Sequence, residues 1–154
     1  MPAGGLPFID VHALEVAATP ERAWDALREV LERSFRGRRT ELFARLLGAS
    51  QTQPRGDPGE AGAAIVGFRV VRAQEPTELD LEGEHRFSRY ALTFRLDALA
   101  DQRSRIRAET RAEFPGLHGR AYRAAVIGTR AHVILVRRLL HAIRARAERP
   151  ADAA

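Results

Sequence analysis

Residues 119–148 read GRAYRAAVIGTRAHVILVRRLLHAIRARAE and close a chain that otherwise alternates as strands do. Apolar residues recur there every three or four positions, which predicts one long amphipathic helix. A polar interruption, residues 128–132, lies halfway along it. Gly128 costs about 1 kcal/mol relative to Ala inside a helix, so it indicates either close packing or a bend. A long helix laid against a curved sheet encloses a pocket, and this segment therefore predicts a container for a small molecule.

Four consecutive segments upstream of this helix alternate between apolar and charged residues. Residues 78–84 are the strictest case, with Leu79 and Leu81 on one side and Asp80 and Glu82 on the other. One apolar and one charged face predict an antiparallel meander with one side toward water. The outer acids and arginines are expected to pair across the sheet. The four predicted strands are 63–73, 78–84, 87–97 and 103–114.

The N-terminal third predicts one strand and two helices. Residues 8–16 alternate as a strand and place His12 on the same face as Leu14. Thr19 and Pro20 then give a helix N-cap and a first helical position. The buried stripe of this helix is Trp24, Leu27, Leu31 and Phe35, and a short second helix is expected from Thr40 to Gly48. Residues 49–62 have the Gly/Pro-rich composition of a loop.

The segment 11–27 resembles the opening of the START-like, Bet v 1-like helix-grip (SRPBCC) superfamily, where a strand passes through a Pro turn into a helix bearing a Trp. Residues 68–96 and the start of the last helix, Arg120-Ala121-Tyr122, are similar to it too. The chain looks most like bacterial polyketide cyclase/dehydratase-type members. The resemblance implies an α+β fold in which an antiparallel sheet wraps around a long C-terminal helix. Five strands are clear where the superfamily has six or seven, so a missing strand is placed in 42–55.

Composition limits the classes of function. At 154 residues without cysteine, the chain is expected to be one domain, 1–149, with a disordered tail, 150–154, and no disulfide or thiolate chemistry. We expect a cytoplasmic protein, because no secretory signal or apolar membrane span is visible. The final 35 residues carry eight Arg against Glu148 and Asp152. No nucleic-acid motif accompanies that charge, and no His or acidic spacing suits a metal.

The candidate ligand-binding residues are the polar and aromatic side chains on the predicted inner faces. Tyr90 is the best single candidate, because a phenol in an apolar cavity can orient a ligand carbonyl or hydroxyl. A purely structural role is the alternative for each residue, since buried polar groups usually satisfy a backbone partner. Read as a straight helix, the last segment turns Thr129 toward the sheet and sends Arg130 and His132 to opposite flanks. The candidates are Tyr90, Trp24, Phe68, Phe94, Thr110, Tyr122, Val126, Thr129, Arg130 and His12.

Three functions fit this pattern. The preferred one is a non-enzymatic module without a cofactor. It binds a small hydrophobic or amphipathic molecule, of lipid, polyketide or aromatic type, in a cavity between the sheet and the C-terminal helix. The second is a cyclase- or aromatase-type enzyme using Tyr90, His12 or Arg130 as acid or base, although the superfamily lends no shared catalytic residue. The third is an anionic partner bound by the arginine-rich helix end. The back of the helix carries Ile127, Ala131 and Ile134, which are expected either to pack on the first helices or to form a homodimer contact.

Overall fold

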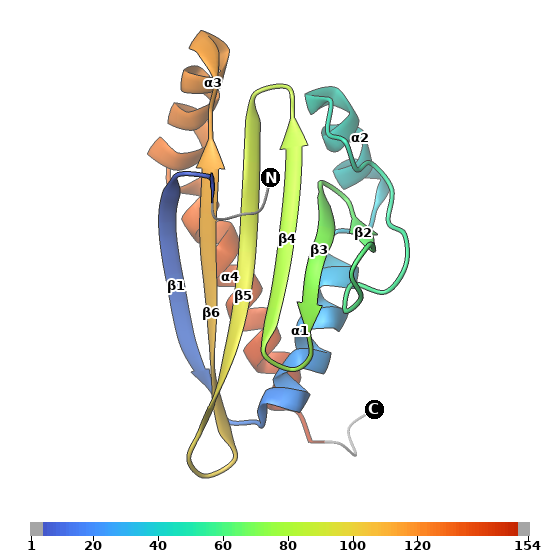
Figure 1. The fold of residues 1–154 in the computed structure, drawn as a ribbon, viewed down its shortest axis with the longest axis vertical. Coiled ribbons are helices and arrows are strands. Elements are labelled where there is room, and N and C mark those ends of the chain that lie inside the picture. The colour runs from blue at the N-terminus through green and yellow to red at the C-terminus, as the bar shows by residue number, and fades with distance from the viewer. Residues whose placement is uncertain (1–4, 151–154) are drawn as a thin grey trace.

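The computed structural model describes residues 5–150 and shows a six-stranded antiparallel sheet with helices on one of its faces (Figure 1). The strand order is β1-β6-β5-β4-β3-β2. The strands are β1 (Phe8–Val16), β2 (Ala64–Ile65), β3 (Phe68–Gln74), β4 (Glu78–His85), β5 (Ser88–Leu99) and β6 (Arg103–Glu113). The helices are α1 (Pro20–Ser34), α2 (Arg38–Leu47), α3 (Gly116–Arg123), the π-helical turn η2 (Ala124–Gly128) and α4 (Ala131–Ala147).

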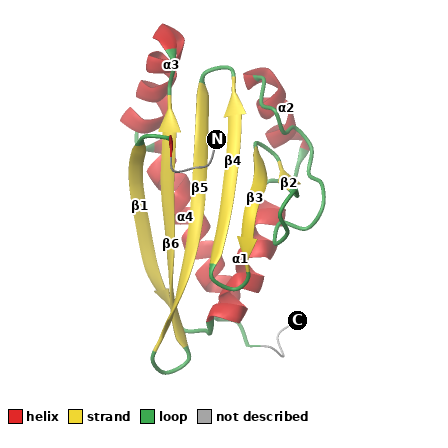
Figure 2. Ribbon diagram, viewed as in Figure 1, coloured by secondary structure: helices red, strands yellow, loops and turns green. Residues whose placement is uncertain are grey.

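This architecture confirms the predicted α+β helix-grip arrangement, including the two helices after the first strand. Figure 2 shows the sheet as one layer, with α1 and α4 behind it. The expected tail, apart from Pro150, lies outside the described residues. Among those residues, no helix is both long and apolar enough to cross a membrane.

Helix α1 forms where the sequence predicts it. The Thr19 hydroxyl accepts a hydrogen bond from the Arg22 amide at 3.4 Å, and Pro20 occupies the first helical position. The first turn of a helix leaves amide donors without a partner. Thr19 accepts a hydrogen bond from one of them, and Pro20 has no amide hydrogen to pair. Trp24, Leu27 and Leu31 are fully buried along one stripe, and the helix packs on the sheet and on α4.

The outer face of the sheet is a ladder of ion pairs, as the alternation predicted. Arg95 on β5 bridges Glu78 on β4 at 2.9 Å and Glu109 on β6 at 3.2 Å. Arg89 reaches Glu113 at 3.1 Å in the same way. Cross-strand pairs of this kind favour the observed register, so these charges are structural.

The sixth strand is not where it was expected. Residues 42–55 do not form it; α2 occupies the first part, and Arg55 makes an isolated bridge to Ala64. The predicted strand 63–73 is instead divided into β2 and β3. Gly67 lies between them with φ of +87°, a backbone conformation that interrupts a strand and that glycine adopts without steric cost. The chain folds back there, and β2 pairs with β3.

The prediction of one continuous C-terminal helix is also wrong. The backbone widens into η2, and Arg130 then takes a left-handed conformation with φ of +60° before α4 begins. The Thr129 hydroxyl donates a hydrogen bond to the Ala125 carbonyl, a local bond that commonly bends helices. Gly128 therefore ends a turn, and Thr129 is exposed instead of facing the sheet.

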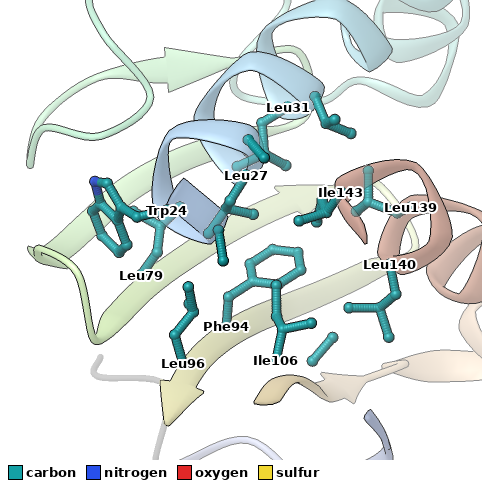
Figure 3. Packing of buried hydrophobic residues seen from close by; sticks show 14 of the residues in the cluster. Trp24, Leu27, Leu31, Leu79, Phe94, Leu96, Ile106, Leu139, Leu140 and Ile143 are labelled. Carbon is teal, nitrogen blue, oxygen red and sulfur yellow. The ribbon is translucent and has the colours of Figure 1, made fainter. Parts of the chain in front are cut away.

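The solid core fills only part of the space behind the sheet. It lies where α1 and the C-terminal half of α4 meet the strands (Figure 3). Trp24 and Phe94, both 0% exposed, are its largest side chains. The other labelled members are Leu27, Leu31, Leu79, Leu96, Ile106, Leu139, Leu140 and Ile143.

Candidate functional site

A cavity of about 620 Å³ lies beyond the solid core, between the sheet, α2, η2 and the N-terminal half of α4. Pockets for small organic molecules have roughly 300–1,000 Å³. Phe43 on α2 and Leu135 on α4 both line it and are 60% and 59% exposed, which places its mouth between these helices. Its deeper wall includes Phe68, Tyr90, Leu92, Thr110, Ala112, Tyr122 and Val136.

The space exists because small residues flank Tyr90 on the inner face of the sheet. The register of the strands places Gly83 of β4 on one side of Tyr90 and Ala112 of β6 on the other. Further along the same strands, Phe94 occupies the corresponding inward position and closes the space. The sheet's inner face is therefore divided along its length, with large apolar residues in one half and small residues around Tyr90 in the other.

Tyr90 is fixed in the cavity wall. Its hydroxyl donates a hydrogen bond to the Gly67 carbonyl at 2.7 Å, and its ring meets Phe68 edge-on with centroids 5.0 Å apart. A Cβ at Gly83 would lie 2.4 Å from the Tyr90 ring and 2.1 Å from the Gly67 oxygen, so glycine is required beneath the ring. Burial raises the pKa of Tyr90, with smaller contributions from Tyr122 and Glu84.

An aromatic cluster lies near α3, and two of its members, Tyr122 and His85, line the cavity. The Tyr122 ring lies 4.7 Å from His85 and 5.8 Å from Phe87, measured between centroids. His85 accepts a hydrogen bond at Nδ1 from the Phe87 amide at 3.1 Å. Burial lowers the pKa of His85, because desolvation disfavours the charged imidazolium. The Tyr122 and His85 rings can stack on a planar ligand.

The side toward β1 is polar. Asp10 lies 3.3 Å from His132 at the start of α4 and 3.3 Å from His12 on its own strand, each distance joining a carboxylate oxygen to Nε2. Thr110, the register partner of Asp10, and His132 both line the cavity. Within residues 5–150, no group of three or more His, Cys, Asp or Glu is arranged to hold a metal ion.

The sequence candidates fall into three places. Phe68, Tyr90, Thr110, Tyr122 and Val126 line the cavity. His12 faces inward as predicted, but it contacts Asp10 and is not among the residues that line the cavity. The remaining candidates lie outside it: Trp24, Phe94, Thr129 and Arg130.

These four residues lie outside the cavity lining for two physical reasons. Periodicity predicts the face of the strand or helix on which Trp24 and Phe94 lie. It does not predict whether a position on that face borders the core or the cavity. Both residues belong to the solid core. Thr129 and Arg130 are exposed because the helix is interrupted at that point. The same interruption brings His132 into the lining, where a straight helix would have placed it on a flank.

The candidates predicted from the sequence did not include Asp10, His132 or His85. The signal for Asp10 was available, because a period of two puts it on the same face as His12. His132 had no such signal, since its direction depends on the left-handed residue before α4.

Comparison with known proteins adds evidence on the fold. No family model and no curated protein matches the chain. Among solved structures, truncated norcoclaurine synthase from Thalictrum flavum superposes with a TM-score of 0.58 at 12% identity, over 90% of this chain and 94% of that one. A START superfamily protein from Mycobacterium smegmatis gives 0.55 at 12% identity, over 92% and 97%. The chain has the START-like, Bet v 1-like helix-grip fold.

These identities, all near 12%, show the fold alone. A protein from Chromobacterium violaceum is likewise similar, with a TM-score of 0.54 at 12% identity over 92% of this chain and 100% of the other. Function on a shared fold is set by particular side chains, so the residues of this cavity must carry the functional argument.

Proposed function

We propose that the protein binds a small hydrophobic or amphipathic molecule in the cavity between the sheet and α4. The observation that carries this proposal is the division of the inner face. One half is filled by Trp24, Phe94 and their neighbours, while the other leaves about 620 Å³ lined mainly by apolar and aromatic side chains. Empty apolar space lacks favourable contacts, and a ligand that fills it would restore them.

The fold supports the proposal without naming the ligand. A norcoclaurine synthase point mutant with this fold, at a TM-score of 0.57 and 11% identity, has been solved in complex with a transition state analogue. In the present chain, Tyr122, Phe114 and Phe68 supply flat surfaces to the cavity. These rings favour a planar or polycyclic ligand over a single flexible chain.

Helix α2 supplies the movable part of the wall. Ala44 is its only buried residue, whereas Leu42, Phe43 and Leu46 are 60%, 60% and 67% exposed. An element with so few buried apolar contacts opens at low free energy. A ligand can therefore enter between α2 and α4 without disturbing the core.

The two alternative functions have less support in the geometry. The acid–base groups proposed for an enzyme do not converge, because the Tyr90 hydroxyl is bonded to Gly67 and Arg130 is exposed outside the cavity lining. At the arginine-rich end of α4, Arg146 forms a two-bond pair with Glu29, at 2.7 and 3.0 Å. That pairing reduces the charge offered to an anionic partner.

A blocked cavity tests the proposal. Ala112 is 5% exposed and lines the cavity, so Ala112→Phe should occupy the ligand's space. Ala13→Phe is the matched control, because Ala13 is an exposed strand residue outside the lining. In a fluorescence titration with pyrene, we expect wild type and Ala13→Phe to bind equally and Ala112→Phe to bind at least about tenfold more weakly, a change of about 1.4 kcal/mol.

Equal affinity for pyrene in both variants would overturn the proposal, and so would the absence of pyrene binding to wild type. Native mass spectrometry of protein purified from its own host complements the titration. A co-purifying small molecule that is lost in Ala112→Phe would identify the chemical class directly.

A further inference from the structure

Exposed apolar side chains flank the mouth of the cavity. Within residues 5–150, eight large apolar side chains are exposed, and five of these are Leu42, Phe43 and Leu46 on α2 and Ile134 and Leu135 on α4. Phe43 and Leu135 also line the cavity, so the exposed apolar surface adjoins its opening. Apolar side chains gathered at one place on a protein surface indicate a site of contact with another molecule or a membrane.

Arginines without ion-pair partners stand on the same two helices. Arg38, Arg39 and Arg45 on α2 and Arg138 on α4 are all exposed, and Arg138 also lines the cavity. None of the four forms an ion pair with another residue in the described part of the chain. Arg95 on the outer face of the sheet, by contrast, is bridged to two acids. The charge at the mouth is therefore free to act on a partner.

The charged and apolar side chains are mixed on one exposed side of α2. Residues four apart on a helix are neighbours, so Arg38 lies next to Leu42, and Arg39 lies next to Phe43. Glu41 is the only acidic residue of α2, and α4 has none. The exposed face is thus both apolar and positively charged.

This combination favours an anionic lipid surface over a second copy of the chain. A two-fold dimer would place this face against itself, and the arginines of one copy would then oppose those of the other. Like charges brought together at an interface are unfavourable. A bilayer with anionic headgroups offers phosphates to the arginines and, just beneath them, acyl chains to the leucines and the phenylalanine.

We propose that α2 and the N-terminal half of α4 dock on an anionic membrane surface, with the mouth of the cavity toward the bilayer. Arg38 and Arg39 contact lipid phosphates, while Leu42 and Leu46 enter the headgroup region. A hydrophobic molecule can then pass between bilayer and cavity without crossing water. That passage rests on the proposed function of the cavity, whereas the docking itself rests on the exposed face.

Co-sedimentation with vesicles tests the docking at physiological salt. We expect wild type to bind vesicles made of equal parts phosphatidylserine and phosphatidylcholine, and not vesicles of phosphatidylcholine alone. A cationic residue close to an anionic surface contributes about fivefold to binding, so Arg38→Gln/Arg39→Gln should bind at least about tenfold more weakly. Leu42→Ala/Leu46→Ala should also lose about tenfold, because it removes the apolar groups that enter the headgroup region.

Arg103→Gln/Arg105→Gln is the matched control. It removes the same charge from exposed positions on β6, where both arginines pair with Glu15 on the outer face of the sheet. Since that face lies away from the helices and salt screens distant charges, its vesicle binding should stay within about twofold of wild type. None of the six substituted or paired residues lines the cavity, so all three variants should bind pyrene in solution as wild type does, and circular dichroism should show them folded.

The outcomes separate the docking from the cavity. Absence of wild-type binding to the anionic vesicles, an equal loss in the control, or unchanged binding by Leu42→Ala/Leu46→Ala would overturn the docking and leave the cavity proposal intact. A dimer that is seen by sedimentation velocity and is lost in Leu42→Ala/Leu46→Ala, without vesicle binding, would assign the face to a second copy instead. Failure of pyrene to bind wild type would refute the cavity proposal alone.

Discussion

Gly83 shows how one residue shapes the cavity wall. The Tyr90 ring and the Gly67 carbonyl meet directly over its α-carbon, and an added Cβ would be 2.1 Å from the carbonyl oxygen. That carbonyl is backbone and cannot move away without distorting β2 and β3. Gly83 is thus needed for the hydrogen bond that fixes Tyr90.

Gly83→Ala should therefore destabilise the protein by about 1–3 kcal/mol, the usual cost of overpacking. Gly128→Ala is the matched control, because a Cβ there would meet nothing within 4 Å. Alanine has the higher helix propensity, so Gly128→Ala should be neutral or stabilising by up to about 1 kcal/mol. Urea unfolding of both variants measures the difference. Equal free energies of unfolding for the two variants would show that Gly83 carries no packing constraint.

Tyr90 should also govern stability at alkaline pH. Burial raises the pKa of its phenol in the folded protein above the value near 10 of an exposed tyrosine. The neutral form is favoured by the fold, so this contribution is fully present below about pH 10 and is lost as the pH rises through the folded pKa. The free energy of unfolding of wild type should fall above about pH 10.

Tyr90→Phe tests that assignment. It removes the titrating group, so its free energy of unfolding should fall less steeply above about pH 10 than that of wild type. At neutral pH it should be less stable by about 1–2 kcal/mol, because the Gly67 carbonyl loses its donor. Identical alkaline slopes for the two proteins would contradict a coupling between Tyr90 and stability.

At the scale of elements, α2 and the interrupted C-terminal helix set access to the cavity. The amides of α2 should exchange with deuterium faster than those of α1, because α2 buries one residue and α1 buries six. Saturating pyrene should slow exchange in Arg38–Leu47 and leave α1 unchanged. Exchange in α2 that is as slow as in α1 without ligand would contradict its role as the movable wall.

Element prediction from sequence succeeded where periodicity is regular and failed where the backbone leaves it. The alternation around Leu79 and Leu81 located the central strands, and the Thr19–Pro20 cap located α1. Gly67 and Arg130 adopt positive φ angles that no hydrophobic pattern reveals. Those two positions account for the misplaced sixth strand and for the helix break.

At the scale of the whole molecule, the inner face of the sheet carries the solid core along one part of its strands and the cavity along the other. The chain order and the residues at 11–27 were enough to predict the fold and the presence of an inner apolar face. Which positions along the strands are covered by core side chains depends on where α1 and α4 pack against the sheet, and this packing involves residues far apart in the sequence. Trp24 and Phe94 were consequently predicted in the pocket wall, although they build the core.

Because the core is solidly packed and the cavity is not, shortening a core side chain should lower the free energy of unfolding more than shortening a side chain of the cavity wall. Phe94→Ala should destabilise the protein by about 3–5 kcal/mol, because it opens a void in packed surroundings. Val126→Ala removes a half-buried side chain that already borders the cavity, so it should cost less than about 1 kcal/mol. Thermal unfolding of the two variants, each compared with wild type, measures the contrast. Similar costs would show that the two regions are packed alike.

The central claim is that a ligand occupies the cavity, and methyl NMR during a pyrene titration tests it most directly. The methyl groups of Ala112, Val126 and Leu135 line the cavity, and ring currents from bound pyrene should shift them. Those of Leu27 and Ile106, in the solid core, should stay in place. Shifts confined to the lining methyls are the predicted result; shifts restricted to exposed residues such as Leu42 and Leu46, with Ala112 unmoved, would contradict the account.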